Sequence, residues 1–312
     1  MLRLALTQVL SVLVAVVATL TVVFFAVRAL PGDAAVILGG LETQTEQVEA
    51  LRGELGLDLP LSVQYVRYWA DLLRGDLGTS LRERRPVGEM LRERLWVTLS
   101  LAGLAFSLAL VSGLTVGLLA GRRTGTTGDG VALGLTTVGL TLPEFWLGFL
   151  LILLFSVQLG WFPLIGLPVE GDLGVRLWHL ILPAVTLAVP RAAQIARLAR
   201  ARLLEEASAD YVRTARSKGV SPRALTRHVA ANALPGLLPL LALELGGLLT
   251  GTIVVEQVFG LPGLGSTLLG AIAARDYPVV QGVAVLAVLV YVLVNWLADV
   301  LQMLADPRLR YE

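Results

Sequence analysis

Two glutamates, Glu144 and Glu244, stand near the middle of long apolar segments of the chain. An ionised carboxylate that faces lipid is costly, so we expect both side chains to face the interior of a helix bundle or water. Two carboxylates that converge on one substrate could carry out general acid–base catalysis. They could instead favour a cationic group, or each could be protonated or hydrogen-bonded within the packing. The residue types alone leave these three roles open.

The remaining residues argue against other kinds of catalytic or ligand-binding site. The chain has no cysteine, which excludes disulfides and thiolate metal sites. Its two histidines, His179 and His228, are far apart and lack metal-ligand spacing, so we predict no metal site. We expect neither histidine to lie near both glutamates, which weakens the enzyme interpretation. The chain also contains no Gly-x-x-x-x-Gly-Lys-Ser/Thr run, the loop that holds the phosphates of ATP.

A short polar segment, residues 205–222, separates two long apolar segments and holds the single lysine, Lys218. Gly219 suits the left-handed residue just past a helix end, and Ser221 with Pro222 suits the start of the next helix. We predict a surface helix that docks against a partner through a narrow, smooth stripe bordered by basic residues. The stripe consists of Ala207, Tyr211 and Ala215, and the basic border of Arg213, Arg216 and Lys218.

The composition indicates an integral membrane protein. Of 312 residues, 55% are hydrophobic and only 16% are charged, against roughly a quarter charged in soluble domains. The basic residues lie on short loops between apolar segments, which disfavours a nucleic-acid partner. We predict an all-α fold with six transmembrane helices. The apolar segments are 4–27, 96–120, 131–158, 178–198, 234–258 and 278–304.

Two of these segments contain features that shape the packing of helices. Gly113, Gly117 and Gly121 recur every four residues, which predicts a face that another helix can approach closely. The segment 131–158 is interrupted by Pro143, which predicts a kink with an unpaired carbonyl.

The spans divide the chain into four parts. Residues 1–30 form the first transmembrane helix, and the polar segment 31–95 forms a small lobe outside the membrane. Residues 96–305 form a core of five helices that includes the segment 205–222, and residues 306–312 form a tail. Excess positive charge gathers in the loops 121–130 and 191–231 and in the tail, so the positive-inside rule places both termini and the segment 205–222 in the cytoplasm.

The segment from Asp210 to Gly219, followed by His228 and by Asn232-Ala233-Leu234-Pro235, resembles the signature cytoplasmic loop of ABC importer permeases, in the dipeptide, oligopeptide and nickel group. The long lobe after the first helix is similar to that of the first of the two permease subunits in such systems. Eight further matches run along the chain. They lie at residues 30–33, 55–60, 75–78, 145–148, 255–259, 261–265, 275–282 and 306–308.

The resemblance implies a type I ABC importer transmembrane domain in the cell membrane, with a coupling helix that sits in a cleft of an ATPase subunit. It implies a second homologous permease subunit, two ATP-binding subunits that bind ATP and Mg, and an extracytoplasmic solute-binding protein. The wider importer motif has Glu-Ala-Ala before its glycine, whereas Glu206-Ala207-Ser208 lies too far upstream here. The coupling residues implied are Asp210, Tyr211, Arg213, Ala215, Lys218 and Gly219.

We therefore predict a transport subunit without catalysis of its own, which forms a translocation path for peptides or a related small solute. Within that path, Glu144 and Glu244 would favour a cationic group such as the amino end of a peptide or a divalent metal. The same architecture could carry nickel or another metal complex. An intramembrane enzyme and a passive channel are the alternatives from other classes.

Overall fold

The computed structural model describes residues 2–29, 35–36, 45–54, 56–168 and 172–305. The described residues are helical apart from loops and one isolated bridge between Thr79 and Pro86. The motifs at 30–33 and 306–308 and the predicted tail 306–312 lie outside the described residues, as does part of the predicted lobe.

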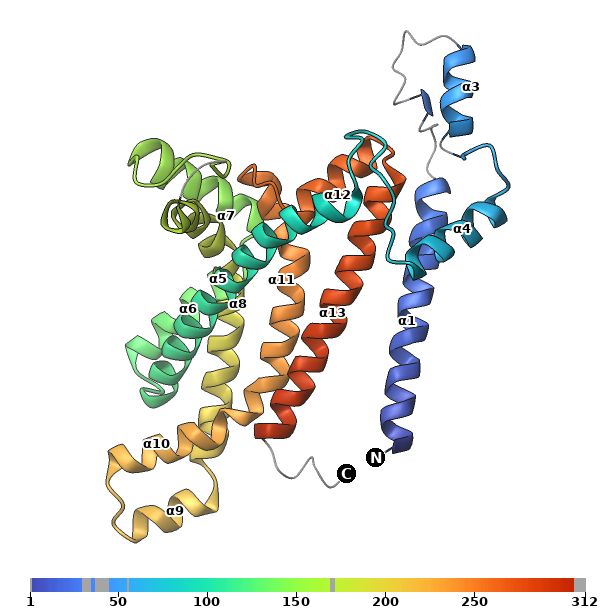
Figure 1. Cartoon of the computed structure of the whole chain (residues 1–312). Coiled ribbons are helices and arrows are strands. Elements are labelled where there is room, and N and C mark those ends of the chain that lie inside the picture. The colour runs from blue at the N-terminus through green and yellow to red at the C-terminus, as the bar shows by residue number, and fades with distance from the viewer. Residues whose placement is uncertain (1, 30–34, 37–44, 55, 169–171, 306–312) are drawn as a thin grey trace. The chain divides into compact units, whose positions relative to one another are not determined.

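Five helical segments are long and apolar enough to cross a membrane (Figure 1). A sixth span results if two consecutive helices, α6 (Thr127–Thr141) and α7 (Glu144–Leu151) with its π-helical extension η1 (Ile152–Gln158), cross together. This agrees with the predicted all-α fold. The other spans are α1 (Leu2–Ala29), α5 (Val87–Arg122), α8 (Leu173–Ala207), α10 (Pro222–Ala233) continued through η2 (Pro235–Leu237) into α11 (Leu238–Val258), and α13 (Tyr277–Ala305).

The predicted kink at Pro143 is a complete break. Leu142 and Pro143 both have extended backbone, and the helix axes on either side differ by 105°. A proline disfavours helical backbone at the residue before it, so α6 ends at Thr141. Glu144 therefore lies in the first turn of α7 and not within a continuous span.

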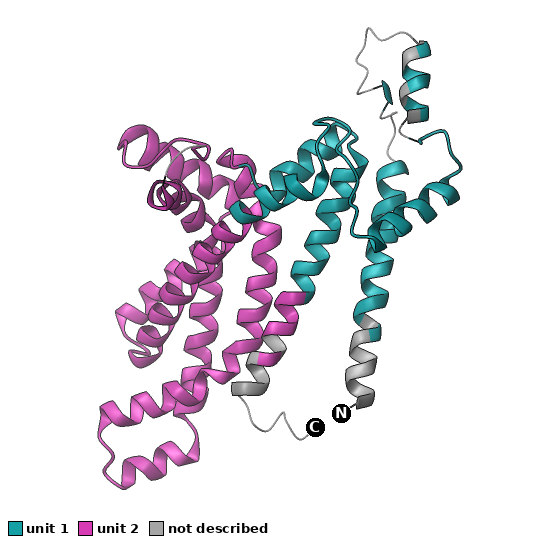
Figure 2. Cartoon of the chain, viewed as in Figure 1, with its two compact units in different colours: residues 1–97, 262–292 teal, residues 98–261, 293–312 magenta. Residues whose placement is uncertain are grey.

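The described chain forms two compact units (Figure 2). Unit 1 comprises residues 1–97 and 262–292, so a segment of the expected core packs with the first helix and the lobe. It contains α3 (Thr45–Glu54), α4 (Leu61–Leu73) and α12 (Leu264–Ala273). Its apolar core is formed by Val87, Leu91, Val279, Val280, Val283 and their neighbours.

A buried carboxylate ties the lobe to the start of α13 within unit 1. Asp276 accepts hydrogen bonds from the hydroxyl of Ser80 at 2.5 Å and from the amides of Leu81 and Arg82 at 3.1 and 3.2 Å. The turn before it places Arg275 at a φ of 57°. This tie holds together residues that are almost 200 positions apart in the chain.

Unit 2 comprises residues 98–261 and 293–312. Here the glycine stripe of α5 lies against α8, as the four-residue spacing predicts. A Cβ added at Gly113 would lie 2.7 Å from the carbonyl oxygen of Ala192, and one at Gly117 would lie 2.5 Å from that of Ala196. At Gly121 the nearest atom would be a methyl of Leu203, at 2.8 Å. These distances leave no room for a side chain, so the glycines allow the two backbones to approach.

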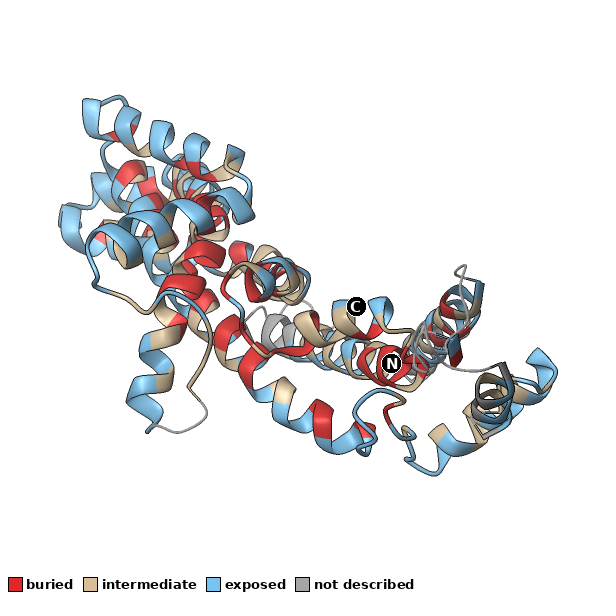
Figure 3. Cartoon of the chain, turned by 90° about the horizontal axis from the view of Figure 1, so that it is seen from above, coloured by how far each residue is buried: buried red, intermediate tan, exposed pale blue. Residues whose placement is uncertain are grey.

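Exposed residues cover much of the surface of both units (Figure 3). Many are large and apolar, which in a membrane protein is the surface that lipid covers. Examples on the predicted spans are Val111, Leu135, Phe149, Leu243 and Tyr291.

Candidate functional site

The two glutamates converge on one arginine in unit 2. Arg191 of α8 places its Nη2 3.2 Å from Oε1 of Glu144 and its Nε 3.3 Å from Oε2 of Glu244. The side chain of Arg191 is 19% exposed, that of Glu144 20% and that of Glu244 7%. Arg191 Nη2 also donates to the carbonyl oxygen of Gly247 at 3.4 Å. One cation thus connects α7, α8 and α11.

This arrangement follows from two local features of the sequence. The break at Pro143 starts a new helix at Glu144, whose first turn faces α8 and α11. Gly251 of α11 makes room for the contact, because a Cβ there would lie 3.0 Å from Oε2 of Glu144 and 3.3 Å from Nη2 of Arg191.

Both glutamates were predicted from the sequence, whereas Arg191 was missed as a site residue. It was grouped with the basic residues of the segment 191–231, although it falls within the predicted span 178–198. In the structure α8 continues to Ala207 and keeps Arg191 within the helix bundle. The signal was present, since Arg191 follows Pro190 in an apolar stretch of that helix. With both carboxylates ionised, the three side chains carry a net charge of −1, so part of their negative charge is left for a second cation.

The polar segment 205–222 forms a separate helix, α9 (Asp210–Ser217), between α8 and α10. Gly219 has a φ of +75°, and the hydroxyl of Ser221 accepts a hydrogen bond from the amide of Ala224 at 3.4 Å, with Pro222 in the first turn of α10. The predicted helix end and the predicted helix start are therefore confirmed.

The predicted outward stripe is wrong in one respect. α8 ends at Ala207, so Ala207 is not in register with Tyr211 and Ala215 on one helix. Both of these side chains pack inward, against a cluster formed by Leu203, Val212, Leu225 and Val229.

Tyr211 fastens α9 to α10. Its phenol oxygen accepts a hydrogen bond from Nδ2 of Asn232 at 3.2 Å, and its ring meets the ring of His228 edge-on at 6.0 Å. Burial raises the pKa of the Tyr211 phenol. His228 therefore lies beside this helix.

The face of α9 that points away from the chain is polar and largely basic. The side chains of Asp210 and Arg213 are 97% and 84% exposed, and Nη1 of Arg213 lies 3.8 Å from Oδ1 of Asp210. Lys218 and Gly219 are also exposed, and a Cβ at Gly219 would meet no atom within 4 Å. Of the predicted coupling residues, these four are available to a partner.

A partly buried ion pair holds the first turn of α6 against α8. Arg200 Nε and Nη2 donate to the two carboxylate oxygens of Asp129 at 2.7 and 2.8 Å, and the amide of Gly125 donates to the same carboxylate at 3.0 Å. A bidentate pair of this kind fixes orientation as well as distance. Arg200 lies two turns before the end of α8, so this pair stiffens the helix that leads to α9.

The described part of the chain contains no group of three or more histidine, cysteine, aspartate or glutamate side chains arranged to hold a metal ion. His179 contacts the carbonyl oxygen of Val175 at 2.9 Å, within α8. His228 lies against Tyr211, so neither histidine contributes to the glutamate site.

The fold and the helical segment between α8 and α10 define a class of protein, the transmembrane domain of a type I ABC importer. A chain of the MetNI methionine ABC transporter in an inward-facing conformation superposes with a TM-score of 0.57 at 23% identity, over 70% of this chain and 96% of that one. A chain of an amino acid ABC transporter superposes with a TM-score of 0.55 at 20% identity, over 69% and 94%. These likenesses concern the fold alone.

The sequence matches identify the family. Residues 113–311 match the binding-protein-dependent transport system inner membrane component, and residues 1–102 match the N-terminal part of such components. The chain belongs to this family, so it is a multi-pass inner-membrane permease and not an enzyme. Permeases of this family act with other components of an ABC importer, such as an ATPase and a substrate-binding protein.

Individual relatives match over nearly the whole chain. A peptide transport system permease of Brucella abortus is 43% identical over 300 residues, 95% of this chain and 95% of its own length. The glutathione transport system permease GsiC of Salmonella paratyphi A is 38% identical over 314 residues, 100% of each chain. A peptide ABC transporter permease of Sinorhizobium fredii is 41% identical over 93% of both chains.

Proposed function

We propose that this chain forms part of the translocation path for short peptides or a peptide-like solute such as glutathione, driven by a separate ATPase. The observation that carries the proposal is the match over nearly the full length to permeases named for peptide and glutathione transport. The nickel alternative is not favoured, because those relatives are named for other cargo.

Arg191 and the two glutamates support a path that carries amino groups. A peptide's amino end is a cation, and it would compete with Arg191 for Glu144, the more exposed of the two carboxylates. Exchange of one cation for another costs less than exposing a bare carboxylate in a site shielded from water. In this proposal Arg191 offsets part of the negative charge of the site between transport events.

The exposed face of α9 would receive the ATPase. Asp210, Arg213, Lys218 and Gly219 would contact it, while Tyr211 and Ala215 would position the helix. The complete importer would contain a second homologous permease, two subunits that bind ATP and Mg, and an extracytoplasmic solute-binding protein. In the proposed orientation both termini and α9 lie in the cytoplasm.

The first test is co-purification of the tagged chain with its partner subunits in mild detergent, followed by ATP-dependent uptake in proteoliposomes. We expect labelled di- and tripeptides or glutathione to be taken up, and nickel not to be. Recovery of the chain without an ATPase, or uptake that does not need ATP, would contradict the proposal.

Gly219→Trp tests the docking face, with Gly219→Asn as the matched control. Tryptophan adds bulk at a left-handed position where most side chains cost about 1–2 kcal/mol, whereas asparagine tolerates that backbone. We expect Gly219→Trp to lower substrate-stimulated ATPase activity about tenfold, an ordinary size for coupling between sites. Full stimulation of this variant would show that the ATPase docks elsewhere.

A further inference from the structure

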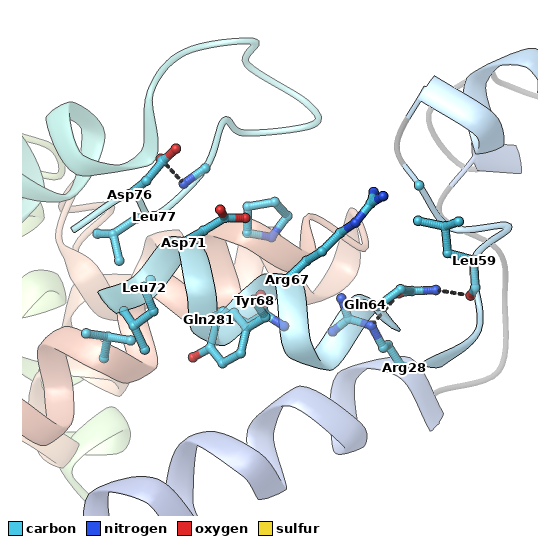
Figure 4. A pocket seen from close by; sticks show the side chains of 15 residues that line it. Arg28, Leu59, Gln64, Arg67, Tyr68, Asp71, Leu72, Asp76, Leu77 and Gln281 are labelled. Carbon is cyan, nitrogen blue, oxygen red and sulfur yellow. Dashed lines mark hydrogen bonds between the residues drawn. The ribbon is translucent and has the colours of Figure 1, made fainter. Parts of the chain in front are cut away.

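Unit 1 contains a cavity of about 290 Å³ that the transport proposal does not use (Figure 4). Residues from α1, α4 and the first turns of α13 line it, together with the loop that follows α4. Its polar side chains include basic, acidic and neutral ones. They are Arg28, Gln64, Arg67, Tyr68, Asp71, Asp76 and Gln281.

The cavity lies where two membrane spans end. Arg28 belongs to the last turn of the candidate span Val12–Ala29, and Gln281 to the beginning of the span Tyr277–Leu297. The core of unit 1 packs these two ends together, since Val27 shares a cluster with Tyr277 and Val280. In a bilayer, the end of a span is the level of the lipid headgroups.

The helix α4 has the properties of a helix that lies in the membrane interface. Its apolar side chains Leu61, Val66 and Leu73 are 51%, 66% and 83% exposed. Its Tyr65 and Tyr68 pack against phenylalanine rings of α1, and Trp69 packs against both tyrosines. Exposed apolar residues beside tyrosine and tryptophan are typical of a segment at headgroup depth.

Two buried donors in the cavity lack a partner. The phenol oxygen of Tyr68 and the amide nitrogen of Gln281 expose almost no surface to solvent and make no hydrogen bond with the described residues, although both side chains line the cavity. Leaving such groups unpaired in a buried place is unfavourable. Burial raises the pKa of Tyr68 to about 12, so the phenol keeps its proton at neutral pH and can donate. Both donors therefore suit an anionic or polar oxygen of a ligand.

The charged residues are only partly committed elsewhere. Arg28 donates to Oε1 of Gln64 at 2.9 Å and lies over the ring of Phe24, whereas Arg67 forms no ion pair with the described residues. Asp71 lies 3.8 Å from the exposed Arg74, and one oxygen of Asp76 accepts from the amide of Gly78 at 2.8 Å. Two arginines and two aspartates give a lining without net charge, which suits a zwitterion better than a free anion.

We propose that this cavity binds the headgroup of a zwitterionic phospholipid with a primary amine. The phosphate accepts hydrogen bonds from Tyr68, Gln281 and Arg67, and the ammonium group pairs with Asp71 and Asp76. The volume is at the lower limit of small-molecule pockets, about 300 Å³, so the headgroup enters and the acyl chains remain outside along α1 and α4. The lipid would then bridge α1, α4 and α13 within unit 1.

The test uses the full chain, purified with its associated subunits and stripped of lipid in detergent. Native mass spectrometry then measures retention of added phosphatidylethanolamine, phosphatidylcholine and phosphatidylglycerol, with free phosphoethanolamine and inorganic phosphate as soluble probes. We expect phosphatidylethanolamine to be retained best. Removing one donor by Gln281→Leu or Tyr68→Phe should weaken retention about tenfold, the equivalent of about 1.4 kcal/mol. Asp71→Asn should weaken retention of phosphatidylethanolamine but not that of phosphatidylcholine.

Stability provides a second measurement that does not depend on retention. Replacing an unpaired buried polar group by an apolar one is neutral or stabilising, so lipid-free Gln281→Leu should unfold at the same temperature as the unaltered protein or higher. Added phosphatidylethanolamine should raise the Tm of the unaltered protein but not that of this variant. The control is Arg85→Gln, which removes an exposed arginine of unit 1 outside the cavity.

Three outcomes would overturn the proposal. Equal retention by the unaltered protein and the cavity variants would place the lipid elsewhere. Preference for phosphatidylglycerol would mean that the aspartates do not select an amine. Binding of free phosphoethanolamine or inorganic phosphate as tight as that of the lipid would assign the cavity to a soluble ligand.

Discussion

A guanidinium held between two carboxylates is the central feature of unit 2 at the scale of single residues. Burying any one of these charges alone would cost several kcal/mol, and the three are tolerated because each has an opposite partner. The set carries a net charge of −1 when both acids are ionised. The proposed exchange with a peptide amine depends on that surplus and on the partial exposure of Glu144.

Replacing either glutamate by glutamine removes the surplus negative charge. We expect Glu144→Gln and Glu244→Gln each to lower peptide uptake up to about tenfold, which corresponds to about 1.4 kcal/mol of lost attraction for a cation. Assembly with the partner subunits should persist, because glutamine keeps the shape and a hydrogen-bonding oxygen for Arg191. Uptake in proteoliposomes is the measurement, and the exposed Glu205→Gln is the control. Unchanged uptake in both variants would exclude a role for the pair in transport.

Gly251 tests the geometry of the same site. In Gly251→Ala the new methyl would lie 3.0 Å from Glu144 and 3.1 Å from Leu187, so we expect a lower Tm and weaker uptake. Overpacking of this kind costs about 1–3 kcal/mol.

Gly247→Ala is the matched control one turn earlier on α11. Its methyl would meet nothing closer than 3.9 Å, and alanine favours a helix over glycine by up to about 1 kcal/mol. Equal Tm values for the two variants would contradict the close approach of Glu144 and Arg191 to Gly251.

At the scale of helices, close contact between α5 and α8 is the feature most sensitive to a single methyl group. We expect Gly117→Ala to destabilise the protein, since the methyl would lie 2.5 Å from the carbonyl oxygen of Ala196 and 2.8 Å from Cβ of Ala199. An added methyl group in such a tight contact forces the backbones apart, which lowers the free energy of unfolding by about 1–3 kcal/mol. Gly103→Ala, on the same helix, would meet nothing within 4 Å and should be neutral. The measurement is the Tm in detergent; an equally stable Gly117→Ala variant would show that the helices lie further apart.

The short helix α9 shows how a break changes the role of a residue pattern. A continuous helix from 205 to 218 would have presented Ala207, Tyr211 and Ala215 on one face. Because α8 ends at Ala207 and α9 starts at Asp210, Ala207 lies on another helix. Tyr211 instead accepts a hydrogen bond from Asn232 of α10. Tyr211 and Ala215 thus position α9, and the exposed basic face of α9 remains available for the partner.

At the scale of the whole molecule, the orientation of the chain in the membrane is open to direct measurement. The chain has no cysteine, so single introduced cysteines report accessibility without background. We expect Lys218→Cys to be labelled by an impermeant thiol reagent only from the cytoplasmic side, and Arg74→Cys only from the opposite side. Both positions are exposed, so labelling is not limited by burial. Labelling of both from one side would contradict the proposed topology.

The sequence alone determined the membrane class, five of the six predicted spans and the family. Twenty-residue apolar segments with arginines at their ends follow from the thickness of a bilayer and need no tertiary information. The glycine stripe of α5 and the signals at Gly219 and Ser221 are equally local, since each depends on backbone geometry within a few residues.

The tertiary structure determined which side chains from distant parts of the sequence contact one another. Arg191 joins Glu144 and Glu244 because three helices meet there, and no spacing along the chain expresses that distance. The cavity between α1, α4 and α13 depends in the same way on segments more than 200 residues apart. Which charges neutralise one another depends on separations of a few ångströms, and only the packing of the helices sets them.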